Sequence, residues 1–215
     1  MKSLKPALWI LLILSATVPQ GLAAADAKAG AGTLTCVGLM SETGEGNISY
    51  RVGKADWVAI KLGDVIPAAA EIRINVDRDW IELIPSANPN LVFDLEGTDK
   101  GELVAKVSDV LKGKSRKVSF PKKSDKTDPA FKDKLVVAQV MGRQVYRASP
   151  DTSDKDIQYG DVLDIKGKVR IIGINNTLNL MFPNGAVTTV IGPLNFEVQK
   201  VFAGSNLYKY LNTGK

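Results

Sequence analysis

Histidine is absent from the 215-residue chain, and cysteine occurs only once. Without imidazole, Ser-His-Asp and Cys-His catalysis are excluded, together with histidine-ligated zinc and the usual general base near neutral pH. A single cysteine excludes an intrachain disulfide and a thiolate metal cluster. Neither a P-loop nor a GxGxxG pattern occurs. We therefore predict that the protein is not an enzyme and that it has no cofactor, catalytic or metal site.

The sequence also lacks a long apolar run of the kind that spans a membrane, which takes about twenty residues. The N-terminal run covers only residues 7–18 and follows Lys2 and Lys5. Small residues come next, so an A-x-A-like cleavage site fits near Ala25. We expect a signal peptide over residues 1–25, with an uncleaved anchor as the alternative. The mature chain is expected to be exported, in the periplasm or at the cell surface, without a transmembrane segment.

Charge of either sign is modest. The chain has 28 basic and 23 acidic residues, a formal net charge of +5, and removal of Lys2 and Lys5 lowers it to +3. Nine of the basic residues and only three acidic ones lie between Lys112 and Lys134. A nucleic-acid binder needs a concentrated basic face with interleaved aromatics, so no nucleic-acid partner is expected.

Two groups of carboxylates are the remaining places for chemistry. Asp77, Asp79 and Glu82 could in principle act as a paired acid and base, but they straddle a predicted turn and are expected to face water. The loop aspartates Asp151, Asp154 and Asp156 lack the Asp-x-Asp-x-Asp-Gly spacing and distal Glu of a calcium loop. Neither group is predicted to be catalytic or to bind metal.

The pattern that is present is that of short strands. Apolar and polar residues alternate, and Gly, Pro, Asn and Asp mark the turns between them. We predict a mostly β protein: a flexible lead-in over residues 26–32, a β unit over 33–111, a basic linker over 112–134 and a second β unit over 135–215. Each unit is expected to be a small sandwich or rolled sheet with one or two short helices, and solenoid-like stacking stays open as an alternative.

Individual elements follow from local patterns. Residues 102–111 have apolar positions at helical spacing and are predicted to form a short amphipathic helix. Residues 196–202 are predicted to be the last strand, and residues 206–211 a final helical turn. Pro183-Asn184-Gly185 predicts a tight turn, because Asn and Gly tolerate positive φ. Cys36 lies in a predicted strand, where a buried, inert thiol is favoured over pairing between chains.

The two units share three short segments at similar spacing, which predicts an internal repeat. The shared segments are Ile48-Ser49-Tyr50-Arg51 with Gln144-Val145-Tyr146-Arg147, Gly63-Asp64 with Gly160-Asp161, and Ile72-Arg73-Ile74 with Val169-Arg170-Ile171. Gly-Asp before an apolar pair is typical of a tight turn, in which Gly supplies an unusual φ and Asp bonds nearby amides. A ligand or acid role for these aspartates is the alternative. The arginines are predicted to occupy the solvent face of their strands.

The same residues resemble the exported FecR-like domain. The resemblance covers residues 135–200 and, less closely, 33–97, and rests on Gly160-Asp161-Val162-Leu163, the strand around Arg170, and the run from Leu178 through Pro183-Asn184-Gly185 to Gly192-Pro193 and Phe196. Members of this family that regulate sigma factors carry a cytoplasmic segment and a membrane helix before the domain. This sequence shows neither, so the resemblance implies two exported FecR-like units without the regulator segment.

From these predictions we expect a binding or scaffold protein of a bacterial cell envelope, with an envelope protein or an envelope polymer as its partner. The alternatives are a signalling regulator that acts through a receptor and a carbohydrate-active enzyme that uses the carboxylates around Asp77. Tryptophans are considered as a sugar-stacking platform and basic residues as a grip for acidic groups, although core packing and solvated charge are the simpler explanations. The candidate binding surface consists of Arg73, Arg170, Trp57, Trp80, Lys114, Arg116, Lys117, Lys122 and Lys123.

Overall fold

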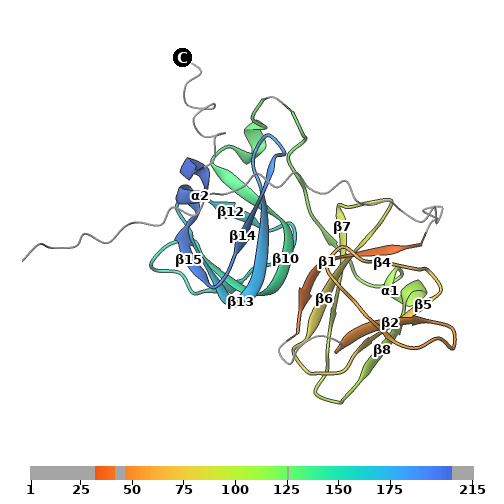
Figure 1. The fold of residues 1–215 in the computed structure, drawn as a ribbon. Coiled ribbons are helices and arrows are strands. Elements are labelled where there is room, and N and C mark those ends of the chain that lie inside the picture. The colour runs from red at the N-terminus through yellow and green to blue at the C-terminus, as the bar shows by residue number, and fades with distance from the viewer. Residues whose placement is uncertain (1–31, 42–46, 125, 205–215) are drawn as a thin grey trace, which may run out of the picture.

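The structure, a computed structural model, describes residues 32–41, 47–124 and 126–204. The predicted signal peptide, nearly all of the lead-in and residues 206–211 lie outside this part of the chain. Within it the fold is mostly β, as predicted, with two sheets and two short α-helices. Figure 1 shows two rolled groups of strands, one formed by the N-terminal half and one by the C-terminal half.

The first unit contains a four-stranded sheet that contributes residues to its core. This sheet has the order β3-β2-β5-β8, and the remaining strands, β1, β4, β6 and β7, belong to the larger sheet. The strands are β1 (Leu34–Met40), β2 (Ile48–Val52), β3 (Val58–Ala59), β4 (Val65–Ile66), β5 (Ala70–Ile74), β6 (Trp80–Pro85), β7 (Leu91–Glu96) and β8 (Leu103–Lys106). Alternation is clearest in β5, where Ala70, Ile72 and Ile74 are buried and Glu71 and Arg73 are not.

The second unit uses two long strands where shorter ones were predicted. β10 (Lys134–Arg147) and β13 (Lys168–Met181) each run for 14 residues and pair with each other antiparallel. The register shifts between Met141 and Arg143, and Gly142 has a φ of 81°, so the pair bends without ending. The shorter strands are β11 (Lys155–Asp156), β12 (Val162–Asp164), β14 (Val187–Ile191) and β15 (Leu194–Glu197).

Two predicted elements are wrong in part. Leu103–Lys106 is strand β8 rather than helix, because these residues pair with β5, and only Val107–Val110 is helical (α1). The predicted last strand ends at Glu197, where α2 (Val198–Gly204) begins. The Val198 amide donates to the Gly167 carbonyl over 2.9 Å, and its side chain is fully buried, so helix α2 closes the second core.

The predicted Gly-Asp turns are confirmed, and their hydrogen bonds match. Gly63 and Gly160 have φ values of 90° and 80°, the left-handed region that glycine accepts at low cost. The Gly63 amide donates to Cys36 O and the Gly160 amide to Val137 O, each over 2.8 Å. The Asp side chains accept from the amides three residues earlier, at 2.8 Å and 3.0 Å. Asp64 and Asp161 are therefore turn residues.

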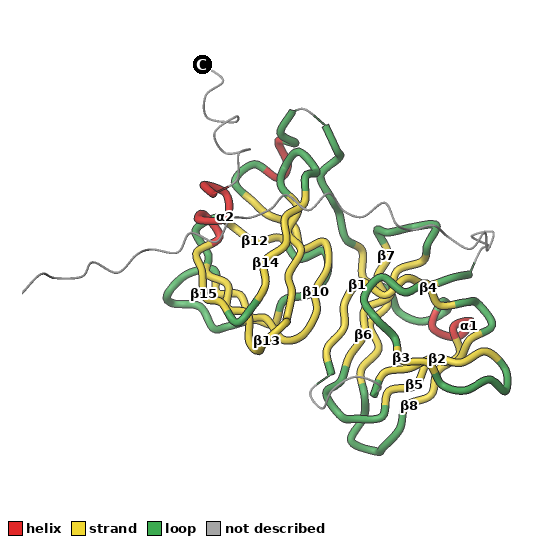
Figure 2. The backbone as a smooth tube through the Cα atoms, viewed as in Figure 1, coloured by secondary structure: helices red, strands yellow, loops and turns green. Residues whose placement is uncertain are grey.

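The two units meet along β1 and β10, which pair in parallel at Gly38–Val140 and Leu39–Met141. The larger sheet therefore runs through both, in the order β14-β13-β10-β1-β6-β7-β9, and Figure 2 shows the strands of both units on either side of this seam. The predicted linker contributes β9 (Arg116–Lys117), which pairs with β7, and the 3-10 turn Pro129–Phe131. A small apolar cluster fills the seam, formed by Val37, Val92, Val118 and Tyr159 with Ile84 and Phe120.

Candidate functional site

A buried carboxylate lies at the seam between the two units. Glu82, on β6, is 1% exposed and lies opposite Gly38 of β1. Its Oε1 accepts from Arg116 Nη2 over 2.7 Å, and its Oε2 accepts from the Tyr159 amide over 2.9 Å. Glu82 therefore joins residues from three distant parts of the chain.

The environment of Glu82 changes its acidity. Burial raises the pKa of this carboxyl to about 7, although the Tyr159 amide and the Arg116 guanidinium both act to lower it. The nearby carboxylates Asp94 and Asp161 add to the rise. Glu82 thus changes protonation state near neutral pH.

Gly38 and Arg116 make this arrangement possible. A Cβ on Gly38 would lie 2.1 Å from Glu82 Oε2, so only glycine leaves room for the carboxylate over β1. Arg116 also donates to the Tyr159 carbonyl over 2.7 Å, and its Nε lies 3.6 Å from Asp94. The predicted ligand-binding residue Arg116 is therefore bound to other parts of the protein itself.

The expectation that Asp77, Asp79 and Glu82 all face water is wrong for two of them. Asp77 is exposed, but Asp79 is 0% exposed and accepts from Ser41 Oγ over 2.8 Å. The turn prediction overlooked that Asp79 and Glu82 lie on or beside β6, a strand covered on both faces. The three carboxylates do not form one open pair.

Trp57 is the centre of an aromatic and basic stack on the outer face of the first unit. The guanidinium carbons of Arg51 and Arg73 lie 4.4 Å and 4.3 Å from the centroid of its ring. Arg51 also pairs with Glu71 at 2.9 Å, and Arg73 donates to Ser49 Oγ at 3.2 Å. Trp57 is half-buried, and the core cluster of the first unit does not include it.

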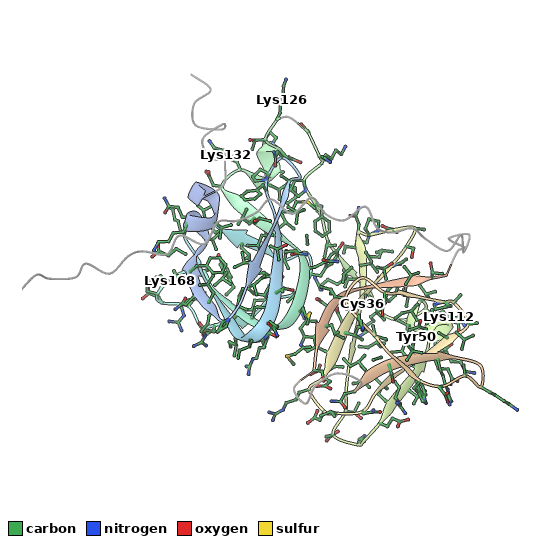
Figure 3. The ribbon with its side chains drawn as sticks, in the orientation of Figure 1. Cys36, Tyr50, Lys112, Lys126, Lys132 and Lys168 are labelled. Atoms are coloured by element: carbon green, nitrogen blue, oxygen red, sulfur yellow. The ribbon has the colours of Figure 1, made fainter. Side chains whose placement is uncertain are left out.

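In the second unit the two matching arginines bind a carboxylate instead. Arg147 and Arg170 pair with Asp154 at 2.7 Å and 3.1 Å. Together with Lys168, the two arginines line a surface hollow of about 310 Å³. Figure 3 shows Lys168 on the side of the second unit that faces away from the first. Arg73 and Arg170 thus occupy outer strand faces, as predicted.

The remaining candidate residues are spread over the molecule. Trp80, on β6, is half-buried and packs against the core of the second unit. Lys117 is exposed on β9, and Lys114 lies in the preceding loop. Lys122 and Lys123 are exposed beside the β13–β14 turn, where Ser124 N donates to Asn184 O over 3.0 Å. The candidates therefore form a stack, a hollow and separate lysines, and not one continuous patch.

Sequence reasoning missed several residues that the structure places with these candidates. Arg51 and Arg147 belong to the shared segments, so the repeat itself was a signal for them. Tyr159 contributes backbone groups, and no side-chain pattern points to those. Gln144, buried at 1% exposure, was read only as part of a strand.

Two of the loop aspartates and the cysteine have ordinary structural explanations. Asp154 and Asp156 form ion pairs with arginines, and within the described residues no group of three His, Cys, Asp or Glu side chains is placed to hold a metal.

Cys36 is fully buried, and burial raises the pKa of its thiol to about 12, so it is a thiol at neutral pH. This agrees with the predicted inert thiol.

The comparisons with known proteins add no family. The chain matches no protein-family model, and neither the curated proteins nor the solved structures contain a significant match. None of the helices in the described ranges has the length and apolar character needed to cross a membrane.

Proposed function

We propose that this chain is an exported, non-catalytic binding or scaffold protein of a bacterial cell envelope. The observation that carries the proposal is the position of the arginines on the outer strand faces of both units. Arg51 and Arg73 in one unit, and Arg147 and Arg170 in the other, present guanidinium groups beside the strands. Guanidinium groups at a surface suit the carboxylate and phosphate groups of an envelope protein or polymer.

The use of Glu82 supports a scaffold rather than a catalyst. A carboxyl with a pKa near 7 is a good general acid or base when substrate reaches it. Here both oxygens accept hydrogen bonds from the protein, and 1% exposure leaves no approach for a substrate. The Glu82 carboxyl, whose pKa is raised, instead holds the two units in one orientation through these hydrogen bonds.

We further infer that the two units are copies of one FecR-like module. The support is the recurrence of the Gly-Asp turn with the same hydrogen bonds, and of a register shift directly after the residue whose carbonyl accepts from the turn glycine. These shifts lie between Cys36 and Gly38 and between Val137 and Gln139. Strand-to-helix closure also recurs, from β8 into α1 and from β15 into α2. The signal peptide that we predict over residues 1–25 supplies the expectation of export.

The test is recovery of the full chain from a bacterial host after cell fractionation. The mature N-terminus is expected near residues 24–26, and the protein is expected to co-sediment with purified envelope at about 0.15 M salt and to be released at higher salt. The double variant Arg147→Gln, Arg170→Gln should weaken this co-sedimentation, with Lys112→Gln as the control for a general loss of charge.

Retention of the protein in the cytoplasm, or a wild-type chain that neither co-sediments nor captures a partner after crosslinking, would contradict the proposal. Capture of one specific receptor with a retained N-terminal segment would favour the signalling alternative.

A further inference from the structure

Strand β14 (Val187–Ile191) is the longest strand in the described ranges that pairs on one side only. It pairs with β13 and ends the larger sheet. The other one-sided strands are two residues long (β3, β4, β9 and β11) or contain a charged residue (β8, β12 and β15). Shortness and charge are usual means by which a sheet edge is kept from pairing with another chain. β14 has the sequence Val-Thr-Thr-Val-Ile and lacks both protections.

The hydrogen bonds of β14 show which backbone groups face its free edge. Just beyond its last residue, the Gly192 amide donates to Asn176 O over 2.8 Å. Hydrogen-bonded and non-hydrogen-bonded pairs alternate along an antiparallel ladder, so Val187, Thr189 and Ile191 direct their N–H and C=O groups away from β13. Within the described part of the chain, these backbone groups have no hydrogen-bond partner.

The first unit contains the same edge in a charged form. β7 pairs with β6 as β14 pairs with β13, and the two ladders align on Glu82 and Asn179, which follow the shared Arg-Ile segments at equal spacing. In this alignment two acidic residues of β7 match two uncharged residues of β14. The matched residues are Asp94 with Thr189 and Glu96 with Ile191.

The edge of β7 is also occupied by another strand. β9 pairs with it antiparallel, with Val92 opposite Arg116, and the Val118 amide donates to Asn90 O over 3.0 Å. In the alignment of the two units Val92 matches Val187. The fold therefore accepts an added strand at this edge in the first unit, and no strand of the described ranges fills the same edge in the second.

A second copy of β14 has the features that this edge requires. Antiparallel pairing about a two-fold axis at Thr189 places Val187 of each copy opposite Ile191 of the other, so that every outward N–H meets an outward C=O. Val187 and Ile191 are 44% and 61% exposed, and the pairing brings these apolar side chains together. No charged residue of either strand opposes this contact.

We propose that this chain forms a two-fold symmetric dimer in which β14 pairs antiparallel with β14 of a second copy, centred on Thr189. A two-fold contact uses this edge in both copies, so assembly stops at the dimer and does not continue into a fibre. The inference goes beyond the proposed binding function and does not depend on it.

Sedimentation equilibrium of the full chain recovered from the bacterial host tests the assembly. The measurement covers about 1–200 μM protein, because a contact made by one short strand is expected to have a dissociation constant in the micromolar range. The average mass should rise with concentration from that of the monomer towards twice that value.

The double variant Thr189→Asp, Ile191→Glu, which installs the acidic residues of β7, is the decisive variant. It places two carboxylates opposite each other at the axis and should weaken dimerisation about tenfold or more. Both side chains are exposed, so the melting temperature should stay within a few degrees of the wild type. If this variant fails to fold, Ile191→Lys alone should weaken the dimer. Val104→Glu, at a 45% exposed position of the edge strand β8, is the matched control and should dimerise normally.

Cysteine substitution tests the register of the pairing. The Cα atoms of a hydrogen-bonded antiparallel pair lie about 5.5 Å apart, within the range that a disulfide accepts. Thr189→Cys should therefore form a covalent dimer on mild oxidation. Val187→Cys, on the same strand, should form far less of it because its position lies opposite Ile191. Cys36 is fully buried and is the same in both variants.

The proposal is overturned if the chain stays monomeric over this range, or if the folded edge variant dimerises as tightly as the wild type. Equal cross-linking of Val187→Cys and Thr189→Cys would also overturn it. A monomeric chain whose double variant no longer co-sediments with envelope would assign the edge to a strand of another protein instead. Because the envelope test uses Arg147 and Arg170, a monomer with intact co-sedimentation removes the dimer alone.

Discussion

The two units place different residues, one acidic and one neutral, at equivalent register positions of their sheets. In the first, Glu82 lies between Gly38 and Asp94 on the neighbouring strands; in the second, Asn179 lies between Gln139 and Thr189. Asn179 accepts from Thr189 Oγ1 at 2.7 Å and donates to Gln139 at 2.6 Å, in a half-exposed neutral chain. Glu82 is instead buried and forms an ion pair with Arg116. The difference teaches that the seam, and not the strand pattern, decides where charge is buried.

A second pair of positions differs in the same manner. Two arginines flank Trp57 in the first unit and Asp154 in the second. One solution stacks the guanidinium groups on an aromatic ring, and the other pairs them with a carboxylate. The backbone thus sets the spacing of the arginines, and the residue between them sets the chemistry of the outer face.

Loss of Arg116 should break the first comparison most severely. In Arg116→Ala the Glu82 carboxylate is left buried without its cation, which is expected to lower the free energy of unfolding by about 3 kcal/mol at pH 8. Asn179→Ala, at the position that matches Glu82, should cost only about 1 kcal/mol because it removes neutral hydrogen bonds. Urea unfolding of both variants measures the difference. Equal losses would show that the seam does not depend on the ion pair.

The pH dependence of stability should come next in size. The pKa of Glu82 rises from 4.5 to about 7 on folding, so the folded state binds more protons between these values. Its contribution to stability is therefore greatest at low pH and is lost as the pH rises through 7, by about 3 kcal/mol in all. Glu82→Gln should remove this slope, measured as the wild-type-minus-variant free energy of unfolding from about pH 4.5 to pH 8. A difference that stays flat over this range would contradict the burial argument.

The smallest effect is expected at the outer faces. Trp57→Ala removes two cation–π contacts and should cost about 1–2 kcal/mol. Asp154→Ala removes two partly exposed ion pairs and should cost at most about 1 kcal/mol, less at high salt. Thermal unfolding at low and high salt separates the two cases. A salt-sensitive loss in Trp57→Ala would indicate that Arg51 acts there chiefly through its ion pair with Glu71.

Local patterns were enough for much of the fold. The alternation in β5, the turn at Pro183-Asn184-Gly185 and the two Gly-Asp turns depend on residues close in sequence, and the structure confirms each of them. Residues 102–111 show the limit, because the same apolar spacing serves a strand as soon as β5 offers an edge. For the candidate site, the outer positions of Arg73 and Arg170 followed from alternation, but their partners did not.

By itself the sequence determined the class of structure, the turns and the outward positions of Arg73 and Arg170, since each depends on backbone preferences and on the period of the strand. Only the tertiary structure decided where Glu82 and Gln144 are buried. Glu82 meets an amide 77 residues away, and Gln144 meets the Thr177 carbonyl 33 residues away. Burial at the seam depends on how β1 and β10 come together, and no local pattern contains that contact.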